Sequence, residues 1–163
     1  MNEEMGELLV GAYLKVIEQC DIVCYNQHIP GGGLEGLGEF DVLGLHFEKQ
    51  TAFLCEVATH IGGLLYVNNK TTVKRIADKH RRQKAYAAAH LKGFLKKRYQ
   101  LWSPVVRNGY LTTKLPQIDP DLELVINEEY TKRVEDLRIQ SREHKNDENN
   151  PAFRLLQILE HLR

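Results

Sequence analysis

Two acidic residues interrupt stretches of sequence that otherwise look like buried β-strands. Asp41 lies within the apolar run 40–45, and Glu56 lies within the apolar run 53–58. Alternate residues of a strand share one face, so both acids are expected on the face of apolar neighbours. An isolated buried carboxylate is costly, which favours pairing with a cation or a metal ion. Carboxylate oxygens suit Mg²⁺ or Mn²⁺, and such an ion can activate water and neutralise charge on a phosphate.

The same two acids also allow a simpler interpretation. They could be acids at the exposed ends of strands, or they could form salt bridges with basic residues further along the chain. The polar piece 48–50 between the two runs is long enough only for a hairpin, so Asp41 and Glu56 are expected on neighbouring strands. Side chains on paired strands can converge at cross-strand distance, which keeps the metal site as the leading hypothesis.

The elements that must position these acids can be predicted from hydrophobic periodicity and from turn signals. In chain order they are a helix over 3–19, strands over 21–29, 39–47 and 51–59, a long helix over 71–97 with a threonine N-cap, strands over 100–106 and 122–126, and helices over 128–144 and from 151 onward. This order predicts an α/β fold with a mixed central sheet flanked by helices. We expect a core over 1–116 and a C-terminal α-rich extension over 117–163 that packs on it.

The region around the two acids resembles a known nuclease signature. The segment 38–43, which contains Asp41, and the segment 53–57, which contains Glu56, together resemble the motif of the PD-(D/E)XK nucleases, a superfamily that includes restriction endonucleases and Holliday-junction resolvases. The resemblance covers roughly residues 3–106 and implies a restriction-endonuclease-like fold. It also implies that Asp41 and Glu56 bind the metal, and that Glu7 on the first helix helps to hold metal or to orient water.

The family's lysine is absent from its usual place. It should stand two residues after the glutamate, where this chain has Ala58, and Phe40 replaces the proline that usually precedes the first acid. The lysine normally positions the attacking water or stabilises charge on the phosphate. In parts of the superfamily it lies on the following helix, which here offers Lys79 beside an apolar stripe and one turn from Gln83. Less favoured substitutes are Lys74, Lys84, Thr59 and His60.

Positive charge is concentrated in one part of a chain whose formal net charge is zero. Residues 70–98 contain eleven Lys or Arg and one acid, which gives this segment a net charge of +10. Such segregation is typical of a phosphate-binding face. The nucleic-acid-binding candidates are Lys74, Arg75, Arg82, Lys84 and Lys92. The segment could instead be a solvated helix face neutralised by the acidic C-terminal third.

Other features narrow the class of protein. The chain has no apolar run long enough to cross a membrane, and the stretch 1–10 is acidic where a signal peptide would be basic, so we expect a cytoplasmic protein. The three cysteines do not have metal-site spacing and are expected to be reduced. The glycine-rich stretch 31–38 lacks a nucleotide-binding motif, although it could form a flap. The last helix is expected to pack on the body or to form a homodimer interface.

These observations predict a Mg²⁺- or Mn²⁺-dependent endonuclease that hydrolyses phosphodiester bonds of DNA. In this hypothesis Asp41 and Glu56 hold the metal, Glu7 assists, and Lys79 replaces the missing lysine. One alternative is a catalytically inactive nucleic-acid-binding module on the same fold. Another is an interaction protein whose basic helix docks on an acidic partner or on its own acidic tail.

Overall fold

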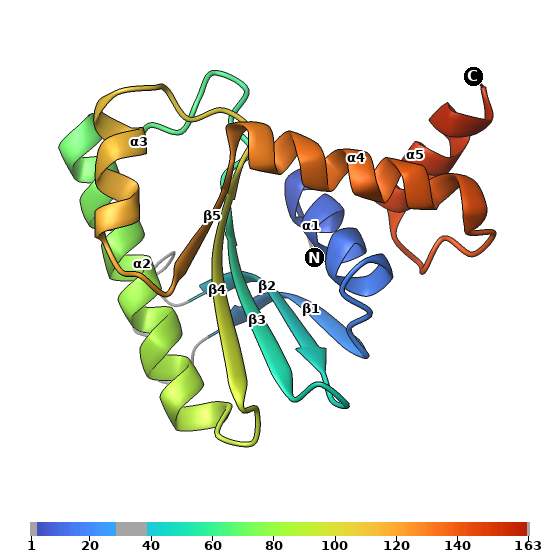
Figure 1. The fold of residues 1–163 in the computed structure, drawn as a ribbon, viewed down its shortest axis with the longest axis horizontal. Coiled ribbons are helices and arrows are strands. Elements are labelled where there is room, and N and C mark those ends of the chain that lie inside the picture. The colour runs from blue at the N-terminus through green and yellow to red at the C-terminus, as the bar shows by residue number, and fades with distance from the viewer. Residues whose placement is uncertain (1–2, 29–38, 163) are drawn as a thin grey trace.

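The computed structural model describes residues 3–28 and 39–162, which form an α/β fold around one mixed sheet (Figure 1). The sheet has five strands in the order β1-β2-β3-β4-β5. Their bounds are β1 Ile22–His28, β2 Glu39–His46, β3 Thr51–Val57, β4 Lys96–Ser103 and β5 Leu122–Ile126. The first three strands pair antiparallel, whereas β3, β4 and β5 pair parallel.

Helices cover both faces of the sheet. Their bounds are α1 Met5–Val16, α2 Asn69–His90, α3 Tyr110–Lys114, the 3₁₀ turn η1 Leu115–Gln117, α4 Asn127–Glu143 and α5 Pro151–His161. Figure 1 shows α2 and α3 on one face of the sheet and α1 and α4 on the other. The last helix, α5, packs against α1 and α4. The α/β class with a helix-flanked mixed sheet is therefore confirmed.

Alternation along β3 divides the core between the two faces. Phe53 and Cys55 belong to the cluster formed with α1 and α4, whereas Leu54 belongs to the cluster that contains Ala87 of α2. Fully burying one large apolar side chain contributes about 1.5–3 kcal/mol, so this pattern fixes which face of β3 is turned toward α2. Glu56 follows the phase of Leu54 and is therefore directed to the α2 side.

The long helix α2 differs from its predicted bounds at both ends. It begins at Asn69 because Asn68, and not a threonine, is the N-cap, and the Asn68 side chain accepts a hydrogen bond of 2.9 Å from the Thr71 amide. It ends at His90 rather than near residue 97. The residues that follow turn back to start β4, and Lys96 pairs with Thr51 in the parallel ladder. The predicted strand over 100–106 therefore begins four residues earlier.

Two further differences from the prediction concern β5 and α1. The strand β5 belongs to the central sheet although it follows residue 116, so the sheet extends past the predicted end of the core. The helix α1 is shorter than predicted, because the chain turns at Gln19, which has a φ of 59°. The predicted hairpin is confirmed by antiparallel pairing of His46 with Thr51. The glycine-rich stretch 31–38 lies outside the described residues.

Candidate active site

The carboxylate of Glu56 is buried at the end of β3 and binds a lysine from α2. Glu56 is 4% exposed, and its Oε1 forms an ion pair with the Nζ of Lys79. A carboxylate at this depth needs a compensating cation, because removal from water strongly disfavours an isolated charge. Lys79 lies 23 residues further along the chain, and the α2 crossover brings it onto the sheet. The predicted proximity of Lys79 to the acids is thus observed for Glu56.

Gln83 holds α2 against β3 one turn beyond Lys79. Its side chain is 1% exposed and donates a hydrogen bond of 3.3 Å from Nε2 to the carbonyl oxygen of Leu54. Residues four apart on a helix share one face, so this bond orients the same face of α2 that carries Lys79. The contact explains why a polar residue lies within the apolar stripe of α2.

Asp41 lies at the start of β2, beside the end of β3. Val42 pairs with Cys55 in the antiparallel register, so the next step toward the strand end sets Asp41 opposite Glu56. The Oδ2 of Asp41 accepts a hydrogen bond of 2.7 Å from the Val57 amide. The side chain is half-buried. This bond ties Asp41 to the residue that directly follows Glu56, and the hairpin therefore brings the two acids together.

Glu7 of α1 is the third acid of this region. Its Oε2 accepts bonds of 3.1 Å from the Glu4 amide and 3.3 Å from the Asn26 side chain. Burial raises the pKa of Glu7, and the negative charge of Asp41 raises that pKa further, while the bonds from Glu4 and Asn26 oppose the shift. The negative charge of Asp41 therefore acts on the Glu7 carboxyl group through space.

A close approach between α1 and the segment after β3 brings Glu7 to this position. A Cβ atom added to Gly6 would lie 2.3 Å from Cγ2 of Thr59, a distance that real Cβ atoms do not show. A residue larger than glycine at position 6 would therefore push α1 away from the strand end that carries Glu56.

Two residues near the acids were not predicted from the sequence. Asn26 donates to Glu7 from β1, and it has a φ of 49°, in the left-handed region. Tyr66 lies within reach of the Asp41 charge, which together with the larger effect of burial raises the pKa of the Tyr66 hydroxyl. An asparagine within a strand and a tyrosine just before a basic helix are weak signals. Only the fold brings these side chains to the carboxylates.

The donor chemistry of the site suits a hard divalent cation. Mg²⁺ prefers oxygen ligands and is commonly held by one or two carboxylates together with water and phosphate oxygens. Asp41 and Glu56, which lie opposite each other in the register of β2 and β3, supply that pair, and the charge of Asp41 also acts on Glu7. Over residues 3–28 and 39–162, however, the structure contains no group of three or more His, Cys, Asp or Glu side chains arranged to hold a metal. Two carboxylates can hold such an ion only together with water or substrate oxygens, and they do not form an all-protein cage.

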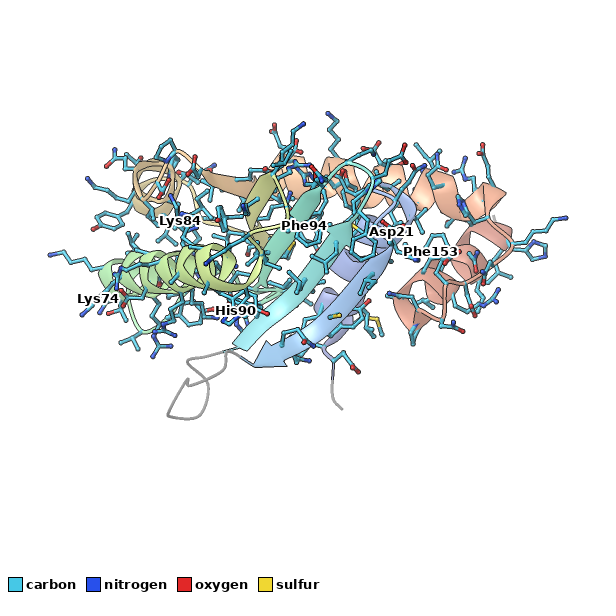
Figure 2. All side chains as sticks on the ribbon, turned by 90° about the horizontal axis from the view of Figure 1, so that it is seen from below. Asp21, Lys74, Lys84, His90, Phe94 and Phe153 are labelled. Carbon is cyan, nitrogen blue, oxygen red and sulfur yellow. The ribbon has the colours of Figure 1, made fainter. Side chains whose placement is uncertain are left out.

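The predicted nucleic-acid-binding residues differ in their exposure and in whether acids of the protein neutralise them. Lys74, Arg75 and Lys92 are exposed, and Arg82 is half-buried. Figure 2 shows Lys74 at the outer side of α2, while Lys84 lies on the side toward α3. The Nζ of Lys84 is 2.9 Å from both Asp119 Oδ2 and Asp121 Oδ2. The charge of Lys84 is thus neutralised within the protein, and we remove Lys84 from the predicted interface.

The basic segment is also less helical than its sequence predicts. Its last three cations lie on β4, where Arg98 donates to Glu123 and to Glu18. The exposed cations Lys70, Lys74 and Arg75 lie in the N-terminal half of α2, ahead of Lys79, which contacts Glu56. Arg75 lies there with its guanidinium 5.1 Å from the centre of the Tyr66 ring.

Cys20, Cys24 and Cys55 are free thiols, and burial raises the pKa of Cys20 to about 12. In the part of the chain that the structure describes, none of the helices is long and apolar enough to cross a membrane.

Comparisons with known proteins identified no relative of this chain. The chain matches no protein-family model, no curated protein and no solved structure.

Proposed function

We propose that this chain is a metal-dependent phosphodiesterase that cuts DNA, with a restriction-endonuclease-like core of the PD-(D/E)XK type. The observation that carries the proposal is the ion pair between Glu56 on β3 and Lys79 on α2. It puts an amine beside the second acid of the motif, although Ala58 occupies the usual position of the lysine. The element order of one helix, three antiparallel strands, a helix and a parallel strand also supports this core.

Each side chain has a separate task in the proposed reaction. Asp41 and Glu56 would hold the divalent cation, which when bound supplies charge neutralisation at the phosphate and acidifies a coordinated water. Lys79 provides positive charge next to Glu56, where it can stabilise charge that develops on the scissile phosphate. Burial and the charge of Asp41 raise the pKa of Glu7, so it can accept a proton from a nearby water more readily than an exposed glutamate.

The exposed cations of α2 would hold the substrate backbone. Lys74 and Arg75 are exposed on the helix that carries Lys79, so phosphates held by them would lie along α2 close to the ion pair with Glu56. Contacts of this kind fix the register of DNA without reading its sequence. We therefore expect little base specificity from α2.

One observation favours a second candidate function. Lys79 binds Glu56 directly, and Asp41 already accepts a bond from Val57. If these bonds persist when nucleic acid binds, the acids hold the fold together and the chain is a non-catalytic binding module. That function predicts salt-dependent DNA binding without cleavage.

The experiment that separates the two functions is cleavage of a supercoiled plasmid with Mg²⁺ or Mn²⁺. The wild type should convert it to nicked and linear forms, and chelation by EDTA should stop the conversion. Asp41→Asn and Glu56→Gln keep the size of the side chains and should each reduce the rate by at least about 100-fold, because they remove charged metal ligands. Glu48→Gln changes an exposed acid in the β2–β3 turn and should retain the wild-type rate. Cleavage that survives Glu56→Gln in a folded protein would exclude the proposed mechanism.

A further inference from the structure

The connection between β3 and α2 exposes three large apolar side chains next to the acids. Ile61 is 91% exposed, Val67 is 83% exposed and Leu65 is 45% exposed. Single exposed apolar residues are common on protein surfaces, but a cluster on one short connection indicates a contact surface. We call residues 59–68 the apolar loop. It starts three residues after Glu56 and ends at the N-cap of α2.

The exposure of these side chains is fixed by the loop's own anchors. Leu64, in the middle of the loop, is buried, and its amide donates a bond of 2.8 Å to the Val105 carbonyl. The Tyr66 amide donates a bond of 2.8 Å to Oγ1 of Thr72. With Leu64 held inward on one side and Tyr66 held to α2 on the other, Leu65 cannot turn into the core. The neighbouring apolar side chains are therefore presented to the outside.

Val67 has a backbone conformation that its side chain disfavours. Its φ is 62°, in the left-handed region, and the Asn68 amide donates a bond of 2.6 Å to the Tyr66 carbonyl across it. This is a γ-turn with a β-branched residue at its centre, a combination that is a true outlier for valine. Glycine or asparagine would relieve the strain, and both would remove the exposed apolar side chain. Strained residues of this kind gather at sites of function.

Charges around the apolar loop indicate what kind of partner it meets. The exposed cations Lys70 and Lys74 lie on the first turns of α2, and Arg75 stacks on Tyr66 of the loop. On the other side, Cγ of Arg107 would lie 3.8 Å from a Cβ atom added to Gly63. Exposed apolar side chains with cations on two sides fit a polyanion that also has apolar faces, between which the side chains can insert. DNA has both features, because its stacked bases lie between two rows of phosphates.

We propose that the apolar loop inserts Ile61 and Val67 into the base stack of bound DNA. Unstacking is least costly at a mismatch, a bulge or a branch point, so the preferred substrate is DNA that contains such a disrupted step. This inference rests on the proposed function for the choice of DNA as the partner. It goes further, because it assigns the chain a structural preference that contacts from α2 cannot provide.

The test is DNA binding with Ca²⁺ in place of Mg²⁺, with 30-base-pair duplexes that are either fully paired or carry one central bulge. A 2-aminopurine next to the bulge reports unstacking through its fluorescence. The wild type should bind the bulged duplex about tenfold more tightly than the paired one, and fluorescence should rise on binding. The variant Ile61→Ala/Val67→Gly should lose both effects and bind the paired duplex as before. Leu162→Ala changes an apolar residue that is 76% exposed and directly follows the distant helix α5, so it is the control and should behave as wild type.

The outcomes separate this inference from the proposed nuclease. A wild type that cleaves DNA with Mg²⁺ but binds both duplexes equally, without a fluorescence change, overturns the inference and leaves the nuclease intact. Preference and fluorescence without any cleavage support the inference and overturn the nuclease. Binding of wild type to anionic vesicles that the loop variant loses, with no DNA preference in either protein, would assign the loop to a membrane surface and also overturn the inference. The melting temperature of the variant should equal or exceed that of wild type, because strain at Val67 is removed.

Discussion

A glutamate as deeply buried as Glu56 is stable in its charged form only beside a positive charge. Lys79 supplies that charge while remaining partly accessible, with 30% of its side chain exposed. A lysine in this position can stabilise the fold and can also reach a phosphate that approaches from outside. These two roles can be separated experimentally, because stability and cleavage are different measurements.

The stability role predicts a specific double-mutant cycle. Lys79→Ala leaves the Glu56 carboxylate buried without its amine, so the free energy of unfolding should fall by roughly 2–3 kcal/mol, reduced from the fully buried case because Lys79 is partly exposed. Lys79→Ala/Glu56→Ala should lose less than the sum of the two single variants. Urea denaturation measures each value. Lys74→Ala, on the exposed face of α2, should change stability by less than about 0.5 kcal/mol. Additive effects in the cycle would contradict the ion pair.

The raised pKa of Glu7 predicts a dependence of stability on pH. Because its pKa is higher in the folded chain than the ordinary value of 4.5, the folded state binds the proton more tightly. This contribution to stability is fully present below about pH 4.5 and is lost as the pH rises through the folded pKa. Glu7→Gln should therefore raise the melting temperature at pH 7 and change it less at pH 4, in thermal scans at both values. An equal change at both values would show that Glu7 is not perturbed.

At the scale of the element, α2 holds Lys79 beside Glu56. The N-cap that stabilises the first turn of α2 can be tested by mutation. Asn68 caps α2 through its bond to the Thr71 amide, and Asn68→Ala should reduce the free energy of unfolding by about 1 kcal/mol. Asn69→Ala is the matched control, because Asn69 is exposed and lies inside the helix, where alanine is the better residue. Chemical denaturation should order the three proteins with Asn68→Ala least stable. Equal stability of the two variants would show that the cap contributes nothing.

The elements show which parts of this fold the sequence can predict. The hairpin of β2 and β3 is predictable because alternation and a short polar turn both specify it, and the alternation also assigns Asp41 and Glu56 to it. The last turns of α2 are harder to predict, because residues 91–97 continue a helix-like composition. Their actual path is decided by pairing of Lys96 with Thr51, a partner 45 residues earlier. Long-range strand pairing outweighs local helix propensity there.

The residues of the candidate site are also only partly predictable from the sequence. The two motif acids can be identified from sequence, and Lys79 can be selected because it lies beside an apolar stripe. The neutralised charge of Lys84 could not be foreseen, since Asp119 and Asp121 approach it only in the folded chain. Asn26 and Tyr66 were missed for the same reason, because their link to Glu7 and Asp41 depends on how α1 and the apolar loop pack on the sheet.

At the scale of the whole molecule, the exposed cations of α2 and of the turn that follows it should determine how DNA binding responds to salt. Each phosphate that is neutralised releases counterions, so the logarithm of the binding constant should fall linearly with the logarithm of the salt concentration. Lys74→Ala and Lys92→Ala should each reduce that slope by about 1. Lys84→Ala should leave the slope unchanged, because Lys84 already pairs with two aspartates. Fluorescence anisotropy across a salt series measures this. A reduced slope for Lys84→Ala would return that residue to the interface.

The proposed role of Lys79 is to supply from α2 the cation that position 58 lacks, and single-turnover DNA cleavage with Mg²⁺ measures this role. We expect wild type and Lys74→Ala to cleave at similar rates once substrate is saturating. We expect Lys79→Ala to be slower by at least about 100-fold, because a charge at the scissile phosphate has been removed, and Lys79→Arg to recover part of the rate. Cleavage by Lys79→Ala at the wild-type rate, or no cleavage by the wild type with Mg²⁺ or Mn²⁺, would contradict the account.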